Sequence, residues 1–137
     1  EALKATLASA RGLKEKGKLF VVFGCGGGRD QGKRPLMGAI ADVGADFSVV
    51  TSDNPRGETP MSIINEVVRG MSARNHIVEE DRKEAIKIAL KNSKPEDIVV
   101  IAGKGHESTQ EIAGELFNFE DREVAKSLIF ELFEEEV

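Results

Sequence analysis

The chain has 137 residues, 40% of them hydrophobic and 31% charged, which is typical of a single folded domain. Its 19 Lys and Arg against 24 Asp and Glu give a formal net charge of −5, which argues against a nucleic-acid partner. No apolar run approaches the roughly 20 residues of a transmembrane helix, so we expect no membrane partner. The single cysteine excludes an internal disulfide and favours a reducing compartment, so we expect a cytoplasmic location.

The first two predicted elements are a helix and a buried strand. Leu3, Leu7 and Ala10 recur at helical spacing directly from Glu1, with no capping residue before them. Since a native chain rarely starts inside a helix, we expect a domain excised from a longer protein. Residues 19–23, LFVVF, form a continuous apolar run, which is typical of a strand covered on both faces.

Helices and strands then alternate along the chain. The glycine-rich stretch 24–34 leads into a helix with Pro35 in its first turn, and the next strand is predicted at 47–51. The polar cluster 52–57 favours a turn, after which Pro60 opens another helix.

The second half of the chain continues this order. Residues 77–78 are extended at most, and Asp81 caps the next helix. Residues 97–102 form a third strong apolar strand, a hairpin is predicted within 111–119, and a last helix begins at Asp121.

This alternation predicts an α/β fold made of one domain, residues 1–137. Strands separated by helices imply right-handed crossovers and a mostly parallel sheet with helices on both faces. We expect the C-terminal hairpin to add an antiparallel edge to this sheet. The loops 24–34, 51–60 and 102–110 follow the three strong strands, and ligands bind at that edge in such folds, so the sequence predicts one site there.

The first loop leaves two interpretations open. It departs from a dinucleotide-binding fingerprint at Arg29 and from a phosphate-binding P-loop at Arg34, where that motif needs Ser or Thr. It is either a glycine-rich tight turn or an anion-binding loop, in which Arg29, Lys33 and Arg34 add positive charge to the backbone N–H groups.

The second loop, Asp53-Asn54-Pro55-Arg56, is either a turn or part of an amino-acid site. In such a site, Arg56 offers a planar fork to a carboxylate, Asp53 accepts from an ammonium group, and Asn54 does either. Together these side chains suit a zwitterionic amino acid.

The third loop contains Gly103, Lys104, His106 and Glu107, and thus a base, a cation and an acid. A lone His is more often structural than catalytic, and the sequence has no Cys/His cluster, so we expect no metal site in this chain. Cys25 has no His or Asp at a spacing typical of a nucleophile, and we interpret it as structural.

The motifs of the chain resemble those of one known family. They occur in the same order as in the C-terminal domain of the Mur ligases, in particular of the type that adds meso-diaminopimelate. The motifs are VVFGCGGGRDQGKRPLMGAIA, VVTSDNPRGETPMSII, DR-x-x-AI, VVIAGKGHESTQ and EDREVA. The resemblance covers essentially all 137 residues, and DNPR together with GKGHE is highly specific.

The resemblance implies a three-domain enzyme whose Rossmann-like C-terminal domain binds the incoming amino acid. The first domain binds the UDP-N-acetylmuramoyl-dipeptide and the central domain binds ATP and Mg²⁺, and we expect both domains to lie outside this chain. The implied reaction is ATP-dependent amide formation in peptidoglycan precursor synthesis. ATP phosphorylates the D-glutamate carboxylate, and the amine of meso-diaminopimelate then attacks it and releases phosphate, so we expect this chain alone to be inactive.

The same resemblance implies the residues that bind meso-diaminopimelate, which are Arg29, Asp53, Asn54, Pro55, Arg56, Gly103 and Glu107. From their place beside the glycines, Lys33 and Arg34 are expected to meet anionic groups of ATP or of the substrate when the domains close. His106 is the candidate catalytic residue through its place in GKGHE. Two alternatives stay open: a lysine-adding ligase of the same family, and a stand-alone module that binds an amino acid or a nucleotide.

Overall fold

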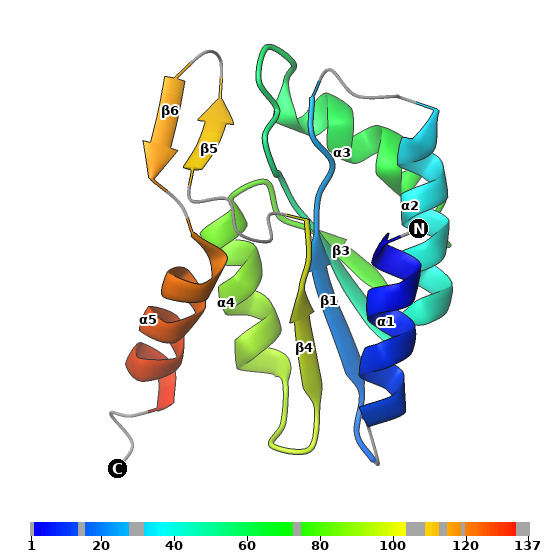
Figure 1. Ribbon diagram of the computed structural model, residues 1–137, viewed down its shortest axis with the longest axis vertical. Helices are drawn as coiled ribbons and strands as arrows, with labels where there is room; N and C mark the ends of the chain where they lie inside the picture. Colours follow the sequence, from blue (N-terminus) through cyan, green and yellow to red (C-terminus); the bar gives the residue numbers. More distant parts are fainter. Residues whose placement is uncertain are drawn as a thin grey trace.

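The chain folds into alternating helices and strands, which are drawn in Figure 1. The computed structural model describes residues 2–13, 16–27, 32–72, 75–103, 109–112, 115–118 and 120–133. The elements in chain order are α1 (Ala2–Leu13), β1 (Leu19–Phe23), α2 (Lys33–Gly44), β2 (Phe47–Val50), α3 (Pro60–Val68), β3 (His76–Val78), α4 (Arg82–Asn92), β4 (Ile98–Ile101), β5 (Thr109–Ile112), β6 (Glu115–Asn118) and α5 (Asp121–Phe133).

Four of the strands form one parallel sheet in the order β3-β2-β1-β4. The register places Phe20 of β1 beside Phe47 of β2 and Val99 of β4. All five residues of β1 are buried, because this strand lies inside the sheet and is covered on both faces. The predicted α/β class with a parallel sheet is thereby confirmed.

Helices cover both faces of this sheet, as predicted (Figure 1). On one face α1, α2 and α3 pack around a hydrophobic cluster that includes Phe23 and Ile64. On the other face α4 and α5 pack around a second cluster that includes Val22, Ile86 and Leu128. Successive side chains of a strand point to opposite faces, so neighbouring residues of β1 contribute to different clusters.

Three helix starts follow the local rules of helix capping. Pro60 is the first residue of α3, and Pro35 lies in the first turn of α2, where a backbone N–H has no partner within the helix. Asp81 precedes α4, and its carboxylate accepts a hydrogen bond from the backbone N–H of Glu84 at 3.1 Å. These three predictions are confirmed.

The prediction that the hairpin adds an antiparallel edge to the sheet is wrong. β5 and β6 do pair antiparallel, but they form a separate two-stranded sheet. Figure 1 shows this hairpin standing above α5 rather than alongside β4. The reason is a side-chain contact: Gln110 of β5 donates to Ser52 Oγ at 2.8 Å and to the carbonyl oxygen of Asp53 at 2.7 Å. These bonds attach the hairpin to the loop after β2.

β3 is a complete, though short, strand at the edge of the sheet. It pairs in parallel with β2, with His76 beside Ser48. The sequence predicts only an extended piece at 77–78, because three residues are too few to show a periodic pattern.

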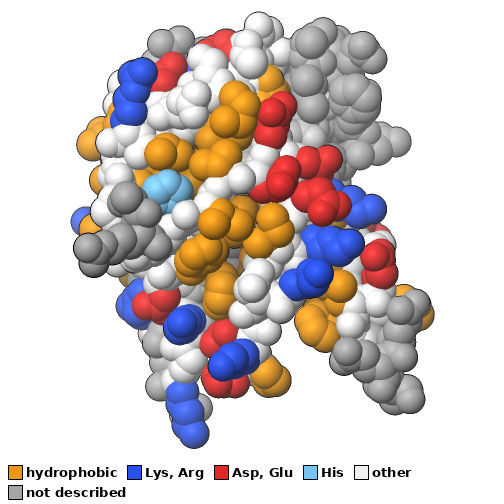
Figure 2. Space-filling model, turned by 180° about the vertical axis from the view of Figure 1, so that it is seen from behind, with side chains coloured by type: hydrophobic (Ala, Val, Ile, Leu, Met, Phe, Trp, Pro, Cys, Tyr) orange, Lys and Arg blue, Asp and Glu red, His pale blue; other side chains and the backbone are white. Residues whose placement is uncertain are grey.

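Within the described ranges, no helix is long and apolar enough to cross a membrane, and α5, the longest there, has 13 residues. Seen from behind, hydrophobic side chains gather across the middle of the molecule, next to a group of acidic ones (Figure 2). In the edge strand β3, Ile77 and Val78 are 36% and 39% exposed.

Candidate functional site

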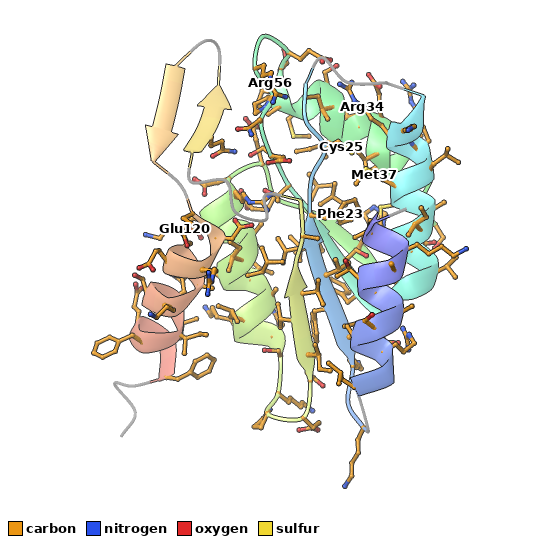
Figure 3. All side chains as sticks on the ribbon, viewed as in Figure 1. Phe23, Cys25, Arg34, Met37, Arg56 and Glu120 are labelled. Atoms are coloured by element: carbon orange, nitrogen blue, oxygen red, sulfur yellow. The ribbon has the colours of Figure 1, made fainter. Side chains whose placement is uncertain are left out.

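The loops after β1, β2 and β4 meet at the carboxyl ends of the strands, where they enclose a pocket of about 420 Å³. Figure 3 shows Arg56 and Arg34 at this end of the molecule, above Cys25 and Met37. Six residues predicted from the sequence to bind the amino acid or an anion line this one pocket: Lys33, Arg34, Asp53, Asn54, Arg56 and Gly103.

The loop after β1 runs directly against the loop after β2. The backbone N–H of Gly27 donates to the carbonyl oxygen of Asn54 at 2.6 Å. A Cβ atom at Gly27 would overlap the carbonyl oxygen of Pro55, so a glycine is needed for this approach. At Gly27, therefore, the glycine-rich stretch serves the packing of one loop against the other.

Arg56 ties the same two loops together. Its Nη1 donates to the carbonyl oxygen of Gly27 at 2.9 Å and to that of Asn54 at 3.3 Å. Its backbone φ is 55°, a left-handed conformation that costs a residue other than glycine roughly 1–3 kcal/mol. The contacts of the loop offset this backbone cost, and the two hydrogen bonds of Nη1 hold the guanidinium at the pocket.

Asp53, Asn54 and Gly103 mark the point where all three loops meet. Asp53 and Asn54 are buried, with 8% and 9% of their surface exposed. Gly103 has a φ of 115°, which suits glycine. A Cβ atom at Gly103 would lie 3.5 Å from Asp53 Oδ2 and 3.5 Å from the carbonyl oxygen of Gly24. A single added methyl group at Gly103 would therefore contact both of the other loops.

Arg34 is buried in the pocket wall and bonded to two carboxylates. Its guanidinium donates to Glu58 at 2.9 and 3.1 Å, to Glu66 of α3 at 3.2 Å and to the carbonyl oxygen of Gly26 at 3.3 Å. The hydrogen bond to Glu58, opposed by burial and aided by Glu66, raises the pKa of Arg34 above its ordinary value. Lys33, by contrast, is exposed at the pocket. The contacts predicted for these two cations on domain closure stay predictions.

A second buried arginine, Arg82, lies behind the loops after β2 and β4. Its Nε and Nη2 each donate to one carboxylate oxygen of Asp121 at 2.8 Å, which makes a bidentate pair. Its Nη1 donates to the carbonyl oxygen of Ser52 at 2.9 Å, and its Nη2 to that of Ala102 at 3.1 Å. The Arg82 side chain is fully buried, so these bonds form away from water.

Sequence reasoning did not include Arg82, Asp121 or Gln110 in the site. All three lie in motifs on which the family resemblance rests, DR-x-x-AI, EDREVA and VVIAGKGHESTQ, and that membership was the available signal. Their contacts were not predictable from it, because 39 residues separate Arg82 from Asp121 along the chain.

Cys25 lies in the wall of the pocket, with its Sγ 3.2 Å from the Sδ of Met37. Burial raises the pKa of the Cys25 thiol to about 11, although the nearby Arg34 lowers it. A thiol with this pKa is protonated at neutral pH and is a poor nucleophile. This agrees with the structural role inferred from the sequence.

Five of the seven residues predicted to bind the amino acid are described, and four of them line the pocket. The fifth, Pro55, is buried within its loop, where its carbonyl oxygen accepts a hydrogen bond from the N–H of Glu58 at 2.9 Å. Arg29 and Glu107, as well as the candidate catalytic residue His106, lie outside the described residues. Their roles stay predictions.

Comparison with known proteins identifies the family of this chain. A sequence model of the family described as "Mur ligase, glutamate ligase domain" matches residues 1–105, which is most of the chain. The chain belongs to this family. The resemblance inferred from the motifs is therefore confirmed.

Two curated relatives of this Mur ligase domain carry the name UDP-N-acetylmuramoyl-L-alanyl-D-glutamate–2,6-diaminopimelate ligase. The protein of that name from Clostridium tetani is 46% identical over 133 residues, which are 97% of this chain and 27% of the relative. The one from Bacillus licheniformis is 49% identical over 132 residues, which are 96% of this chain and 27% of the relative. A solved structure of a ligase with this name superposes with a TM-score of 0.87 at 44% identity, covering 93% of this chain and 26% of that one. The chain thus spans about a quarter of the length of these relatives.

Proposed function

We propose that residues 1–137 are the C-terminal, amino-acid-binding domain of a cytoplasmic, ATP-dependent ligase. This ligase joins meso-diaminopimelate to UDP-N-acetylmuramoyl-L-alanyl-D-glutamate in peptidoglycan precursor synthesis. The observation that carries the proposal is the pocket in which three loops bring Asp53, Asn54, Arg56 and Gly103 together. Identities of 46% and 49% with ligases named for this substrate pair support it.

The pocket offers the chemistry that meso-diaminopimelate needs. This amino acid has a carboxylate and an ammonium group at each end, whereas lysine lacks the distal carboxylate. The planar guanidinium of Arg56 suits a carboxylate through two parallel charge-assisted hydrogen bonds. Asp53 and Asn54 supply acceptors for an ammonium group, and by family resemblance Arg29 and Glu107 complete the site.

The contacts of Arg56 support a role in selecting the amino acid. Its bonds to the carbonyl oxygens of Gly27 and Asn54 fix the guanidinium at the wall of the pocket. A preorganised donor of this kind loses little freedom when it binds a carboxylate, and an analogue without that carboxylate does not form these charge-assisted bonds. The alternative is that Arg56 only closes the turn, in which case its loss does not change the preference for meso-diaminopimelate over lysine.

The part of this domain in the reaction is to position the amine. The amine nitrogen attacks the acyl phosphate of the D-glutamate side chain, so a C–N bond forms while the C–O bond to phosphate breaks and the nitrogen loses its proton. Holding the amine beside the activated carbonyl when the domains close supplies proximity and orientation. The sequence offers no dedicated general base, and His106 is a candidate proton acceptor only through its place in the GKGHE motif.

We assign ATP and Mg²⁺ to the part of the ligase outside this chain. In the ranges that the structure describes, no three His, Cys, Asp or Glu side chains are grouped so that they could hold a metal ion. Arg34 is already paired with Glu58 and Glu66. Lys33, which is exposed at the pocket, is the described cation that we assign to an anionic group of ATP or substrate on domain closure.

The test uses the full-length ligase that contains this sequence. Phosphate release is measured with ATP, Mg²⁺ and the UDP-dipeptide, with either meso-diaminopimelate or lysine as the amino acid. We expect turnover that depends on meso-diaminopimelate, much weaker turnover with lysine, and none from this chain alone. Equal turnover with lysine would indicate the lysine-adding alternative. No turnover with either amino acid, although the protein binds one of them, would indicate a binding module.

A further inference from the structure

One side chain holds two of the pocket loops from behind. Arg82 donates to the carbonyl oxygen of Ser52 at 2.9 Å and to that of Ala102 at 3.1 Å. Ser52 directly precedes Asp53, and Ala102 directly precedes Gly103. A single guanidinium therefore sets the distance between the points at which the loops after β2 and β4 enter the pocket.

The orientation of this guanidinium is itself fixed. Two parallel bonds of 2.8 Å to Asp121 define its plane and leave Nη1 and Nη2 aimed at the two loop carbonyls. Asp121 is the first residue of α5, where a carboxylate also interacts favourably with the helix dipole. Both side chains are buried: that of Arg82 is 0% exposed to solvent and that of Asp121 is 8% exposed.

Gln110 holds the loop after β2 from a different direction. Its Nε2 donates to Ser52 Oγ at 2.8 Å and to the carbonyl oxygen of Asp53 at 2.7 Å, and Gln110 is itself 6% exposed. Ser52 Oγ in turn donates to the carbonyl oxygen of Glu80 at 2.9 Å. The carbonyl oxygens of Ser52 and Asp53 are thus each bonded to a buried side chain, the first to Arg82 and the second to Gln110.

We propose that Arg82 and Gln110 are positioning residues of the amino-acid site, which set the spacing of Asp53 and Gly103 without contacting the amino acid. The proposal rests on the function proposed above. The spacing matters because a Cβ atom at Gly103 would lie 3.5 Å from Asp53 Oδ2 and 3.9 Å from Arg82 Nη2, so a small shift of either loop changes the pocket. Asp121 acts one step further away, by orienting Arg82.

Arg82→Lys in the full-length ligase tests this proposal. Lysine keeps a positive charge beside Asp121, but its three N–H groups share one nitrogen and cannot reproduce the four bonds that Arg82 makes from three nitrogens. We expect the KM for meso-diaminopimelate to rise at least about tenfold, while the KM values for ATP and for the UDP-dipeptide stay within about twofold. The matched control is Arg122→Lys, the same change at an exposed arginine next to Asp121, which should leave all three KM values unchanged.

A purely structural role of Arg82 gives a different result. It lowers the melting temperature but leaves the KM for meso-diaminopimelate unchanged, or raises all three KM values together, and either outcome overturns the proposal. If Arg82→Lys does not fold, Gln110→Met carries the test, because it removes two donors to the same loop at similar volume. The same selective rise in KM is expected, and an unchanged KM overturns the proposal. Turnover by the unmodified ligase tests the proposed function separately.

Discussion

Two buried arginines, one on each face of the sheet, hold the pocket loops in different ways. Arg34 of α2 bonds two glutamates, Glu58 and Glu66, and one loop carbonyl. Arg82 of α4 bonds a single carboxylate, that of Asp121, and two loop carbonyls. The first cluster joins the loop after β1 to α3 and to the loop after β2, and the second joins the loops after β2 and β4 to α5.

The two clusters differ in their access to water. The side chains of Glu58 and Glu66 are 28% and 23% exposed, whereas that of Asp121 is 8% exposed. A carboxylate that keeps contact with water can be hydrated again when its arginine is lost, but a dry one cannot. From this comparison we expect the loss of Arg82 to lower the free energy of unfolding more than the loss of Arg34 does.

The largest loss of stability is expected from replacing Arg82, the arginine whose carboxylate partner is buried. In urea denaturation of this chain, Arg82→Met should lower the free energy of unfolding by about 3–5 kcal/mol, because Asp121 is left buried without its cation. Arg122→Met, the matched change at an exposed arginine, should stay within about 0.5 kcal/mol. If both variants lose the same free energy of unfolding, the buried bonds of Arg82 do not stabilise the fold more than an exposed arginine does.

The reactivity of Cys25 reports how strongly the pocket wall buries its thiol, although the nearby Arg34 lowers the thiol pKa. Burial raises the thiol pKa from 9.0 to about 11, which lowers the thiolate fraction at pH 8 about a hundredfold. Alkylation by iodoacetamide, followed by mass spectrometry, should therefore be about a hundredfold slower in the folded chain than in urea. An alkylation rate equal to that of the unfolded chain would contradict the raised thiol pKa that burial causes.

The same pKa shift gives a pH dependence of stability. The unfolded thiol loses its proton near pH 9 and the folded thiol only near pH 11, so unfolding releases a proton between these values. The contribution of Cys25 to stability is therefore complete below about pH 9 and is lost as the pH rises towards 11. Cys25→Ala should remove this part of the pH dependence, and an unchanged slope would contradict the shift.

A smaller loss of stability is expected on the wetter side. Arg34→Met should lower the free energy of unfolding by about 1–2 kcal/mol, because Glu58 and Glu66 can turn to water. The double variant Arg34→Met/Glu66→Gln should recover part of this loss, since it removes one of two neighbouring like charges. Urea denaturation measures both variants. A loss as large as that of Arg82→Met would remove the distinction between the clusters.

The smallest effect is expected for an ion pair on the surface of the same two helices that carry Arg82 and Asp121. Lys87 of α4 and Glu131 of α5 are 3.9 Å apart, with side chains 31% and 57% exposed. Lys87→Met should change the free energy of unfolding by less than about 0.5 kcal/mol. A larger loss would show that burial is not what separates strong from weak pairs between α4 and α5.

The parallel sheet was predictable because its inner strands carry a strong local signal. Residues 19–23 and 98–101 are unbroken apolar runs, each followed by a glycine within two residues. The place of the hairpin was not predictable, because the side chain of Gln110 fixes it through a contact 57 residues away in sequence. Strand pairing within the hairpin is local, and that part of the prediction holds.

The convergence of the three loops followed from the predicted parallel sheet, since the carboxyl ends of parallel strands share an edge. The partners of the charged residues did not follow. Arg34 was expected to meet an anion of ATP or of the substrate, but its described partners include Glu58 and Glu66, 24 and 32 residues further along the chain. Nothing in the local pattern distinguishes a buried, paired arginine from one that faces a ligand.

The most direct measurement is the amino-acid preference of the full-length ligase when Arg56 is changed to Ala. Steady-state kcat/KM is determined for meso-diaminopimelate and for lysine, with the exposed Arg69→Ala as the matched control. If Arg56 binds the distal carboxylate, kcat/KM for meso-diaminopimelate falls by at least about a hundredfold, and its advantage over lysine shrinks with it. If kcat/KM for the two amino acids keeps its original ratio, Arg56 closes a turn and does not select the substrate.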